Sequence, residues 1–312
     1  MVFPPRIQNR LASLSDFLGA FDVSKPETYR NQLKTITHLF TTWGSMQHVD
    51  EILASAPRLE AIFYVAGDHR AFFTDTLRDS GVRLFSAVEL NSKAVAEYTF
   101  AWVILALKES LPSAEHYRKA GQFPRGARCA GPGAYRTTVG LAGLGHIGRQ
   151  TIALLKQTDL RLIAFDPHVD ADVFRTFGVE PVDDLVDLFR QSRVVSLHLP
   201  LNDKTRAIIK RNCVEALPQG GSLINTARGA LIDQPALLDV LQNRPDLRAY
   251  LDVTDPEPLP DNHPFFHMPN VFLSNHVAGS VNSECERLAD VMIEDFVRIT
   301  QGIPPLYEKF SG

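Results

Sequence analysis

The chain has 312 residues, enough for about two domains with sizeable hydrophobic cores. Its composition is that of an ordinary globular protein, and a net charge of −4 gives no reason to expect nucleic acid or a membrane surface as a partner. No apolar run has membrane-spanning length, and the first residues lack the apolar region of a signal peptide. Because Cys129, Cys213 and Cys285 have neither metal-binding nor redox spacing, we expect free thiols in the cytoplasm.

The first ninety residues alternate between strand and helix patterns. Leu11, Leu14, Phe17 and Leu18 fit one helix face. The expected strands are 35–42, 58–65 and 82–85, and the expected helices are 49–56 and 72–79. This alternation predicts a small parallel sheet with crossover helices.

A second series of elements begins with a long helix from Ala94 to about Glu109, with Ser92 as its possible N-cap. Residues 118–135 are rich in Gly, Pro and Arg, which predicts a loop. After the unit at 139–166 described below, further strand–helix units are expected at 174–178 with 182–189, 194–199, 213–217, 222–225, 234–242, 249–253 and 271–274. The last helix, 282–300, is expected to cross back and pack on the first domain.

Three glycines, Gly143, Gly145 and Gly148, stand between an apolar run and a helical pattern with the spacing Gly-x-Gly-x-x-Gly. The first allows a tight turn, the second lets a pyrophosphate approach the backbone, and the third lets the helix pack close to the strand. The N–H groups of the first helical turn then face the anion. Asp166 ends the next apolar run, where it can bind a ribose 2′-hydroxyl and repel a 2′-phosphate. The unit therefore predicts NAD rather than NADP.

Two α/β domains follow from this order of elements, each with a Rossmann-like, doubly wound parallel sheet. Residues 1–92 and 282–312 are expected to form a flavodoxin-like substrate domain, and residues 93–281 an NAD-binding Rossmann domain. The chain would cross between them twice and leave a cleft at the carboxyl ends of the strands, where such sheets bind ligands.

Polar residues follow the last three expected strands of the larger domain. They include Arg228, Glu257 and His276. Beside a nicotinamide, an arginine can bind a carboxylate, a histidine can give a proton to a carbonyl oxygen, and a glutamate can stabilise the imidazolium. Each residue alone has an ordinary interpretation as a solvated side chain, and only the combination indicates hydride transfer to a carbonyl.

The other histidines are less informative. His146 lies in the glycine loop, where its backbone is expected to touch the cofactor. His198 ends a strand and is interpreted either as a wall of the cofactor site or, with slight preference, as a buried histidine with satisfied hydrogen bonds. His263 and His267 lack a third ligand, so no metal site is expected.

The chain resembles the D-isomer-specific 2-hydroxyacid dehydrogenases over nearly all of residues 58–300. The resemblance rests on the motifs 143–148 with Asp166, 194–201 with 205–206, 224–229, 251–253 with 257–260, 275–279 and 94–97. It implies an NAD-dependent enzyme that interconverts a 2-oxo acid and a D-2-hydroxy acid. His276 would be the acid/base, Glu257 would orient it, and Arg228 would bind the substrate carboxylate.

The resemblance also implies the binding residues and the assembly. The cofactor-binding set is Gly143, Gly145, His146, Ile147, Gly148, Asp166, Pro200, Thr205, Thr226, Ala227, Arg228, Asp252, His276 and Gly279. The substrate-binding set is Ala66, Gly67, Arg228 and His276, with the amides of the first two holding the carboxylate. The family is usually a homodimer joined through its coenzyme domains.

Two departures from the family pattern concern the small domain. Its first convincing strand lies near residue 35, and Gly67-Asp68-His69-Arg70 differs from the usual Gly-x-Asp-Asn. The second departure places charge beside the expected carboxylate loop, so the size and polarity of the substrate stay open. Trp43, Tyr64, His69 and Arg70 are candidates for its side-chain pocket.

Two other functions remain as alternatives. A non-enzymatic NAD-sensing corepressor shares this fold. Such a protein is expected to carry a long disordered tail, and we do not expect the ten residues after Gly302 to form one. Phosphite oxidation would use the same Arg228 and His276. Glu257 argues against the formate dehydrogenase branch, which carries Gln there.

Overall fold

The computed structural model describes residues 2–22, 29–70, 73–121 and 131–310. The chain divides into two compact units, Met1–Ala94 with Gly279–Gly312 and Val95–Ala278. These bounds lie two to three residues from the boundaries expected at 92/93 and 281/282. The C-terminal helix therefore belongs to the unit that contains the start of the chain.

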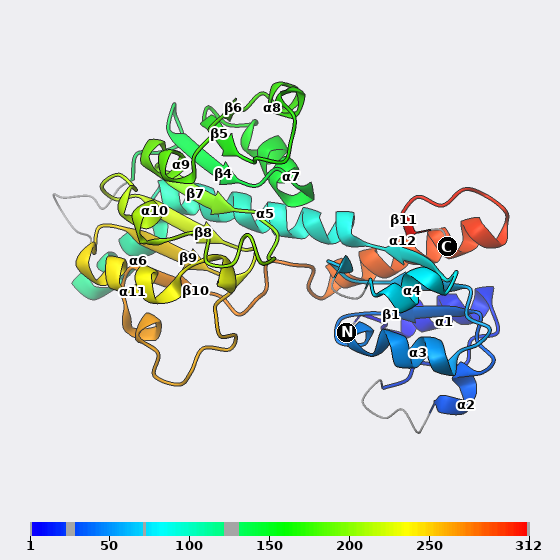
Figure 1. Ribbon diagram of the computed structural model, residues 1–312. Helices are drawn as coiled ribbons and strands as arrows, with labels where there is room; N and C mark the ends of the chain where they lie inside the picture. Colours follow the sequence, from blue (N-terminus) through cyan, green and yellow to red (C-terminus); the bar gives the residue numbers. More distant parts are fainter. Residues whose placement is uncertain (1, 23–28, 71–72, 122–130, 311–312) are drawn as a thin grey trace. The chain divides into compact units, whose positions relative to one another are not determined.

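The larger unit contains a seven-stranded sheet in the order β10-β9-β8-β7-β4-β5-β6, in which every neighbouring pair is parallel (Figure 1). Its strands are β4 Thr138–Ala142, β5 Arg161–Phe165, β6 Glu180–Pro181, β7 Val194–Leu197, β8 Ser222–Asn225, β9 Arg248–Leu251 and β10 Val271–Leu273. The order reverses at β4 and β7, which creates a topological switch point where ligands of such sheets bind.

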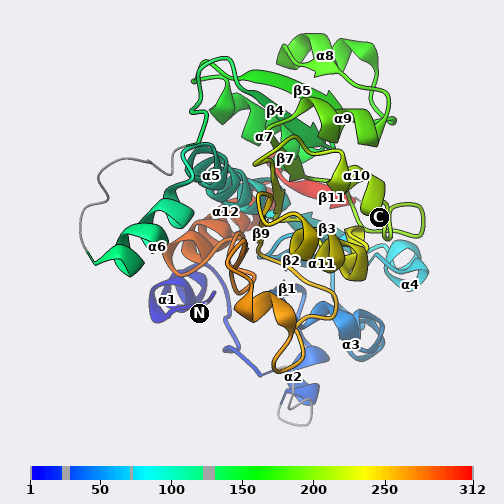
Figure 2. The same cartoon turned by 90° about the vertical axis from the view of Figure 1, so that its left-hand side faces the viewer.

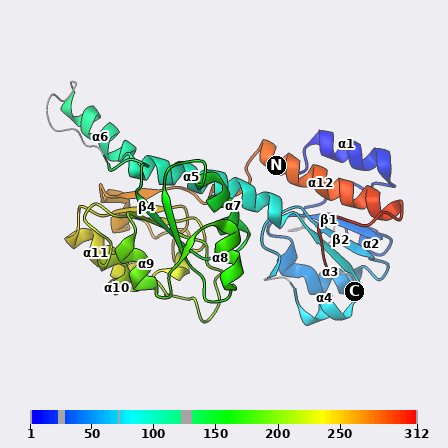
Figure 3. The same ribbon diagram turned by 90° about the horizontal axis from the view of Figure 1, so that it is seen from above.

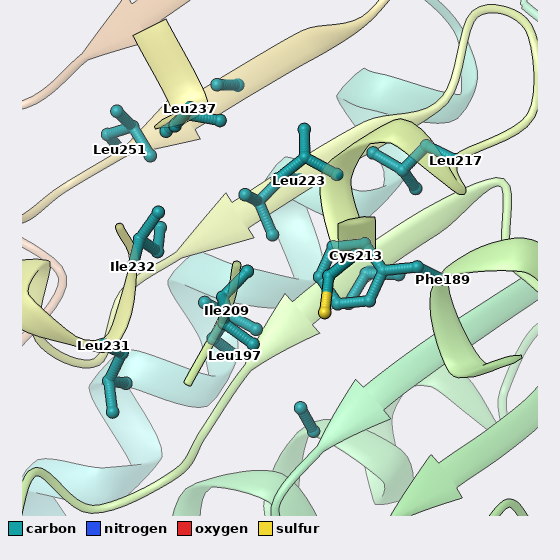
Figure 4. Close-up of a cluster of buried hydrophobic side chains, with 14 of the residues drawn as sticks. Phe189, Leu197, Ile209, Cys213, Leu217, Leu223, Leu231, Ile232, Leu237 and Leu251 are labelled. Carbon is teal, nitrogen blue, oxygen red and sulfur yellow. The ribbon is translucent and has the colours of Figure 1, made fainter. Parts of the chain in front are cut away.

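Helices cover both faces of this sheet because its central strands are apolar on both sides. One face packs with α9 Leu185–Gln191, α10 Arg211–Glu215 and α11 Gln234–Asn243. Figure 4 shows this core, in which Phe189, Leu223 and Leu237 are buried. The other face packs with α5 Val88–Leu107, α7 His146–Leu155 and α8 Ala171–Phe177.

Helix α6, Ser110–Ala120, buries none of its described side chains. It continues from the end of α5 and projects from the rest of its unit (Figures 2 and 3). Two short 3-10 helices, η4 Gly229–Leu231 and η5 Pro264–His267, follow β8 and β9.

The smaller unit has a four-stranded sheet in the order β1-β2-β3-β11. Its strands are β1 His38–Thr41, β2 Ala61–Tyr64, β3 Arg83–Ser86 and β11 Glu308–Phe310. Helices α1 Pro5–Leu14 and α12 Ser283–Thr300 pack on one face, and α3 Val49–Ser55 and α4 Asp75–Asp79 on the other. The helices α2 Arg30–Leu33 and η2 Met46–His48 are short.

Strand β11 was not predicted, and it makes the smaller sheet mixed rather than parallel because it pairs antiparallel with β3. The carboxylate of Asp295, fully buried in α12, accepts hydrogen bonds from the backbone N–H groups of Leu306 and Tyr307 at 2.8 Å each. An ion pair between Arg83 and Glu308 adds a contact across the two strands. A buried acid thus anchors a short strand that has no hydrophobic alternation of its own.

Other differences from the predictions are local. Helix α5 begins at Val88, so Ser92 lies inside it and donates its hydroxyl to the Val88 carbonyl instead of capping the helix. Residues 171–177 form helix α8, and the strand of that unit is the two-residue β6. Helix α1 ends at Leu14, before Phe17.

The predicted loop at 118–135 is occupied by α6 as far as Ala120. Residues 122–130, including Cys129, lie outside the described residues, as does Phe72 at the start of the helix expected over 72–79. The remaining predicted strands and helices occur with bounds shifted by up to about three residues, the ordinary uncertainty of element ends.

Candidate active site

The glycine loop between β4 and α7 is built as the spacing predicted. Gly143 has φ +103°, and a Cβ there would lie 2.7 Å from the His198 carbonyl oxygen. A Cβ on Gly148 would lie 2.2 Å from the Gly143 carbonyl oxygen. A Cβ on Gly145 would meet no described atom within 4 Å. Two glycines are therefore required by close packing, and the third leaves the backbone open to a ligand.

Helix α7 begins at His146, directly after this loop. Its N-cap residue, Gly145, provides no side-chain hydrogen bond, and its first turn contains no acidic residue. The N–H groups of His146, Ile147 and Gly148 belong to this uncapped turn, which suits an anion. The loop and helix thus fit the pyrophosphate of a dinucleotide.

Asp166 follows β5 and holds this loop in place. Its Oδ2 accepts the backbone N–H of Leu144 at 2.8 Å, and its Oδ1 accepts the N–H of His168 at 3.0 Å. The carboxylate is half-buried and has lone pairs left for a ribose hydroxyl. The residues present therefore fit NAD, and the second role of Asp166 as a loop anchor has no signal in the sequence pattern.

Pro200 and Thr205 bound a loop after β7. The hydroxyl of Thr205 donates to the Pro200 carbonyl oxygen at 2.6 Å and accepts the backbone N–H of Asn202 at 2.9 Å. The Thr205 side chain therefore closes the loop on itself. Direct contact of either residue with the cofactor stays a prediction.

The turn after β8 carries Thr226, Ala227 and Arg228. The buried Thr226 hydroxyl lies 3.0 Å from that of Thr99 in α5. Asn225 was not assigned a role from the sequence, yet its buried amide accepts the Ala227 N–H at 3.0 Å and donates to the Arg228 carbonyl at 2.9 Å. A buried Asn can hold such a turn because it offers both a donor and an acceptor.

Arg228 itself is exposed at the carboxyl end of the sheet. Its Nη1 donates to the Ala227 carbonyl at 2.6 Å, and among the described residues no carboxylate forms an ion pair with its guanidinium. The next residue, Gly229, packs on the backbone of Thr254, where a Cβ would lie 2.0 Å from the Thr254 carbonyl oxygen. This close approach joins the loops that follow β8 and β9.

Asp252 directly follows β9 and organises the loop that follows β10. Its carboxylate is buried and accepts the N–H groups of Val277 and Ala278, each at 2.9 Å, together with the Ser274 hydroxyl at 2.7 Å. The N–H of His276 donates to the Asp252 carbonyl at 2.9 Å. This single residue therefore fixes the backbone on both sides of His276, whereas the sequence assigned it only to the cofactor.

His276 and Glu257 form a pair, with Nδ1 of the imidazole 2.5 Å from Oε1 of the carboxylate. Both side chains are partly exposed, at 51% and 40%. His276 has φ +49°, a left-handed conformation that the bonds to Asp252 sustain. The engaged Nδ1 leaves Nε2 as the nitrogen that can face a substrate.

The smaller unit contains the remaining predicted residues. Ala66 and Gly67 follow β2 and are buried, and the Ser86 hydroxyl donates to the Gly67 carbonyl at 3.3 Å. Gly279, predicted to touch the cofactor, also belongs to this unit, and a Cβ there would lie 3.3 Å from Oδ1 of Asn91.

His198 differs from the preferred interpretation as a satisfied histidine. It is 8% exposed, and neither ring nitrogen has a hydrogen-bond partner among the described residues. Burial lowers the pKa of its imidazole to about 4, so the ring is neutral. His263 instead uses Nδ1 to accept the N–H of Phe265 at 3.2 Å and so caps η5.

Other site types find no support in the residues described. Within the ranges given above, no group of three or more His, Cys, Asp or Glu side chains could hold a metal ion. No helix in the described part of the chain is long and apolar enough to cross a membrane. Cys213 and Cys285 are buried free thiols.

The chain is similar to known proteins over most of its length. The family model for the NAD-binding domain of D-isomer specific 2-hydroxyacid dehydrogenases matches residues 101–278. A glyoxylate reductase of Thermofilum pendens is 31% identical over 82% of this chain and 76% of its own length. A D-3-phosphoglycerate dehydrogenase of Methanocaldococcus jannaschii is 30% identical over 81% of this chain. The match covers 48% of that relative, so this chain spans about half of its length.

A solved structure, the 2-hydroxyacid dehydrogenase of Ketogulonicigenium vulgare, has the same fold, with a TM-score of 0.81, 23% identity and coverage of 99% of this chain and 96% of that one. The predicted fold class, two Rossmann-like α/β domains, is thereby confirmed, as is NAD as the cofactor of the matched domain. The chain belongs to the D-isomer specific 2-hydroxyacid dehydrogenases, a family of NAD-dependent oxidoreductases that act on CH–OH donors.

Proposed function

We propose that the protein interconverts a 2-oxo acid and the corresponding D-2-hydroxy acid. The observation that carries this proposal is the His276–Glu257 pair beside the loop of Arg228, at the carboxyl ends of neighbouring parallel strands. This edge of the sheet also carries the glycine loop that fits the dinucleotide. An acid/base, a cation for a carboxylate and a hydride carrier are the three things that the reaction needs.

His276 is assigned as the acid/base. Its Nδ1–H donates to Glu257, so the carboxylate fixes the orientation of the ring and leaves Nε2 for the substrate. In the reduction, Nε2–H gives its proton to the oxygen of the 2-oxo group, and the same nitrogen takes that proton back in the oxidation. NADH, when bound, supplies the hydride that reaches the carbonyl carbon.

Arg228 is assigned to the substrate carboxylate. Its guanidinium presents a planar fork that matches a carboxylate, and it can also polarise the neighbouring carbonyl. The Asn225 amide holds the turn from which this side chain projects. Ala66 and Gly67 of the smaller unit are proposed to hold the substrate carboxylate through their backbone N–H groups.

The assembly is proposed to be a homodimer formed through the larger unit. Helix α6 buries no described side chain, and Tyr117 within it is 51% exposed. An aromatic side chain on a projecting helix is a common anchor of protein–protein contact. Light scattering of the purified protein tests this assembly, and a monomeric mass would contradict it.

The activity is tested by following NADH oxidation at 340 nm with a set of 2-oxo acids. We expect turnover with at least one of them, and loss of nearly all turnover in His276→Ala with NADH affinity retained. Phosphite with NAD forms a separate reaction, and turnover there alone would support phosphite oxidation instead. NADH binding without any turnover would favour an NAD sensor.

A further inference from the structure

The loop at 66–70 of the smaller unit contains Asp68 and Arg70. These charged residues depart from the family pattern and leave the size and polarity of the substrate open in the sequence. Asp68 and Arg70 bind each other: Arg70 donates from Nε to Oδ1 at 2.8 Å and from Nη2 to Oδ2 at 2.6 Å. The backbone N–H of Arg70 also donates to Oδ1 at 3.1 Å. The guanidinium is thus used in a bidentate pair within its own loop.

The charges around His69 cancel in the same way. Four charged side chains act on its ring, Asp68, Glu89, Arg70 and Lys309. Arg70 pairs with Asp68, and Lys309 pairs with Glu89. Burial lowers the pKa of His69, so the imidazole itself is neutral at neutral pH. These five side chains together carry no net charge.

Trp43 is a large apolar side chain that lies near this loop. Strands β1 and β2 are parallel neighbours, so the loops that follow them lie together, and the Thr42 hydroxyl donates to the Val65 carbonyl at 3.1 Å. The indole Nε1 lies 4.0 Å from the position of a Cβ on Gly67. Trp43 is nevertheless 44% exposed, so much of its ring is open to a ligand.

We infer that the substrate carries an uncharged, apolar side chain that packs on Trp43. This inference rests on the proposed function, in which the amides of Ala66 and Gly67 hold the substrate carboxylate. A group next to that carboxylate meets an indole and two internally neutralised ion pairs. A phosphate or sulfonate would find no unpaired cation among the described charges around His69, whereas an apolar group gains by removing indole surface from water.

The test compares three substrates with the full-length protein. Glyoxylate has no side chain, 4-methyl-2-oxopentanoate has an apolar one, and 3-phosphohydroxypyruvate has a dianionic one. We expect kcat/KM to be highest for the apolar substrate and lowest for the phosphorylated one. A highest kcat/KM for the phosphorylated substrate, or for glyoxylate, would overturn the inference while leaving the proposed function intact. The absence of turnover with every 2-oxo acid would overturn both the inference of an apolar side chain and the proposed function.

Variants of Trp43 distinguish a direct contact between the indole and the substrate side chain from a general effect on activity. In Trp43→Ala, the ratio of kcat/KM for 4-methyl-2-oxopentanoate to that for glyoxylate should fall about tenfold, the usual loss for an apolar contact in a pocket. Trp43→Phe should restore part of this ratio. Leu306→Ala, which removes another exposed apolar side chain of the same unit, should leave it unchanged. An unchanged ratio in Trp43→Ala would contradict the assignment.

A variant of Asp68 tests whether the pairing of Arg70 with Asp68 disfavours a substrate with an anionic side chain. Asp68→Asn releases Arg70 from its pair, so kcat/KM for 3-phosphohydroxypyruvate relative to glyoxylate should rise about threefold to fivefold, the scale of a partly exposed ion pair. Asp75→Asn breaks the exposed Arg78–Asp75 pair in the same unit and should leave the ratio unchanged. No rise in Asp68→Asn would show that Arg70 does not face the substrate.

Discussion

Asp252 holds the backbone around His276. Its buried carboxylate accepts the N–H groups of Val277 and Ala278, the two residues after the histidine, and its backbone carbonyl accepts the N–H of His276 itself. His276 has a positive φ, which a histidine seldom adopts without such support. The geometry of this loop therefore depends on a residue that need not touch the substrate.

Replacing Asp252 by Asn should disturb the loop, because an amide has one oxygen and cannot accept both N–H groups as the two carboxylate oxygens do. Charge-assisted hydrogen bonds of this kind contribute about 1.5–3 kcal/mol each. We expect kcat to fall by about tenfold to a hundredfold and the pH profile of kcat to change shape. Asp255→Asn, at an exposed position of the loop that follows β9, is the control and should keep the wild-type kcat and pH profile. A wild-type pH profile in Asp252→Asn would contradict a positioning role.

Asp166 is expected to act on NAD binding in two ways, through the ribose and through the glycine loop. Asp166→Ala removes the acceptor of the Leu144 and His168 N–H groups, so NADH affinity should fall about tenfold or more. Asp166→Asn keeps one oxygen for the loop and removes the negative charge, so it should relax discrimination against NADPH with a smaller loss of NADH affinity. Fluorescence titration with both cofactors measures this, and an unchanged preference in Asp166→Asn would show that another group contacts the ribose.

His198 should make the protein sensitive to acid. Its pKa is lowered to about 4 by burial, below the ordinary 6.5, so the folded state favours the neutral ring. The contribution of neutral His198 to the stability of the folded state is fully present above pH 6.5 and is lost as the pH falls towards 4. The shift corresponds to about 3 kcal/mol of unfolding free energy over that interval.

Urea unfolding between about pH 7 and about pH 4 measures this effect. His198→Gln, which stays neutral throughout, should lose less stability on acidification than the wild type. His116→Gln, at an exposed position, should behave as the wild type does. The half-buried His38 has a pKa lowered in the same direction by burial, so part of the acid sensitivity should persist in His198→Gln. Identical pH dependence in His198→Gln and the wild type would contradict the assignment.

Gly229 should tolerate no side chain. A Cβ there would lie 2.0 Å from the carbonyl carbon and oxygen of Thr254, which belong to rigid backbone. Gly229→Ala must push apart the loops after β8 and β9, so we expect a loss of stability of about 1–3 kcal/mol, the usual cost of overpacking, and reduced activity. Gly302→Ala is the comparison: its Cβ would meet nothing within 4 Å, and its cost comes only from φ +71°. Thermal unfolding of both variants measures this difference, and a Gly229→Ala protein as stable as Gly302→Ala would contradict the role of the contact with Thr254.

The sequence by itself determined the parts of this protein that depend on local pattern. The glycine spacing with Asp166, the alternation of strands and helices, and the polar residues after successive strands all followed from residue type and distance along the chain. Parallel strands bring their carboxyl ends to one edge, so His276, Glu257 and Arg228 could be assigned to one region without coordinates.

The tertiary structure decided what depends on contacts between distant residues. Buried Asp295 accepts hydrogen bonds from the two residues that lead into strand β11. The anchoring roles of Asn225, Asp252 and Asp166 likewise lie in hydrogen bonds to backbone groups. The early start of α5 and the pairing of Arg70 with Asp68 are equally invisible in a pattern. A hydrogen bond to a backbone amide leaves no trace in hydrophobic periodicity, because its donor is present in every residue except proline.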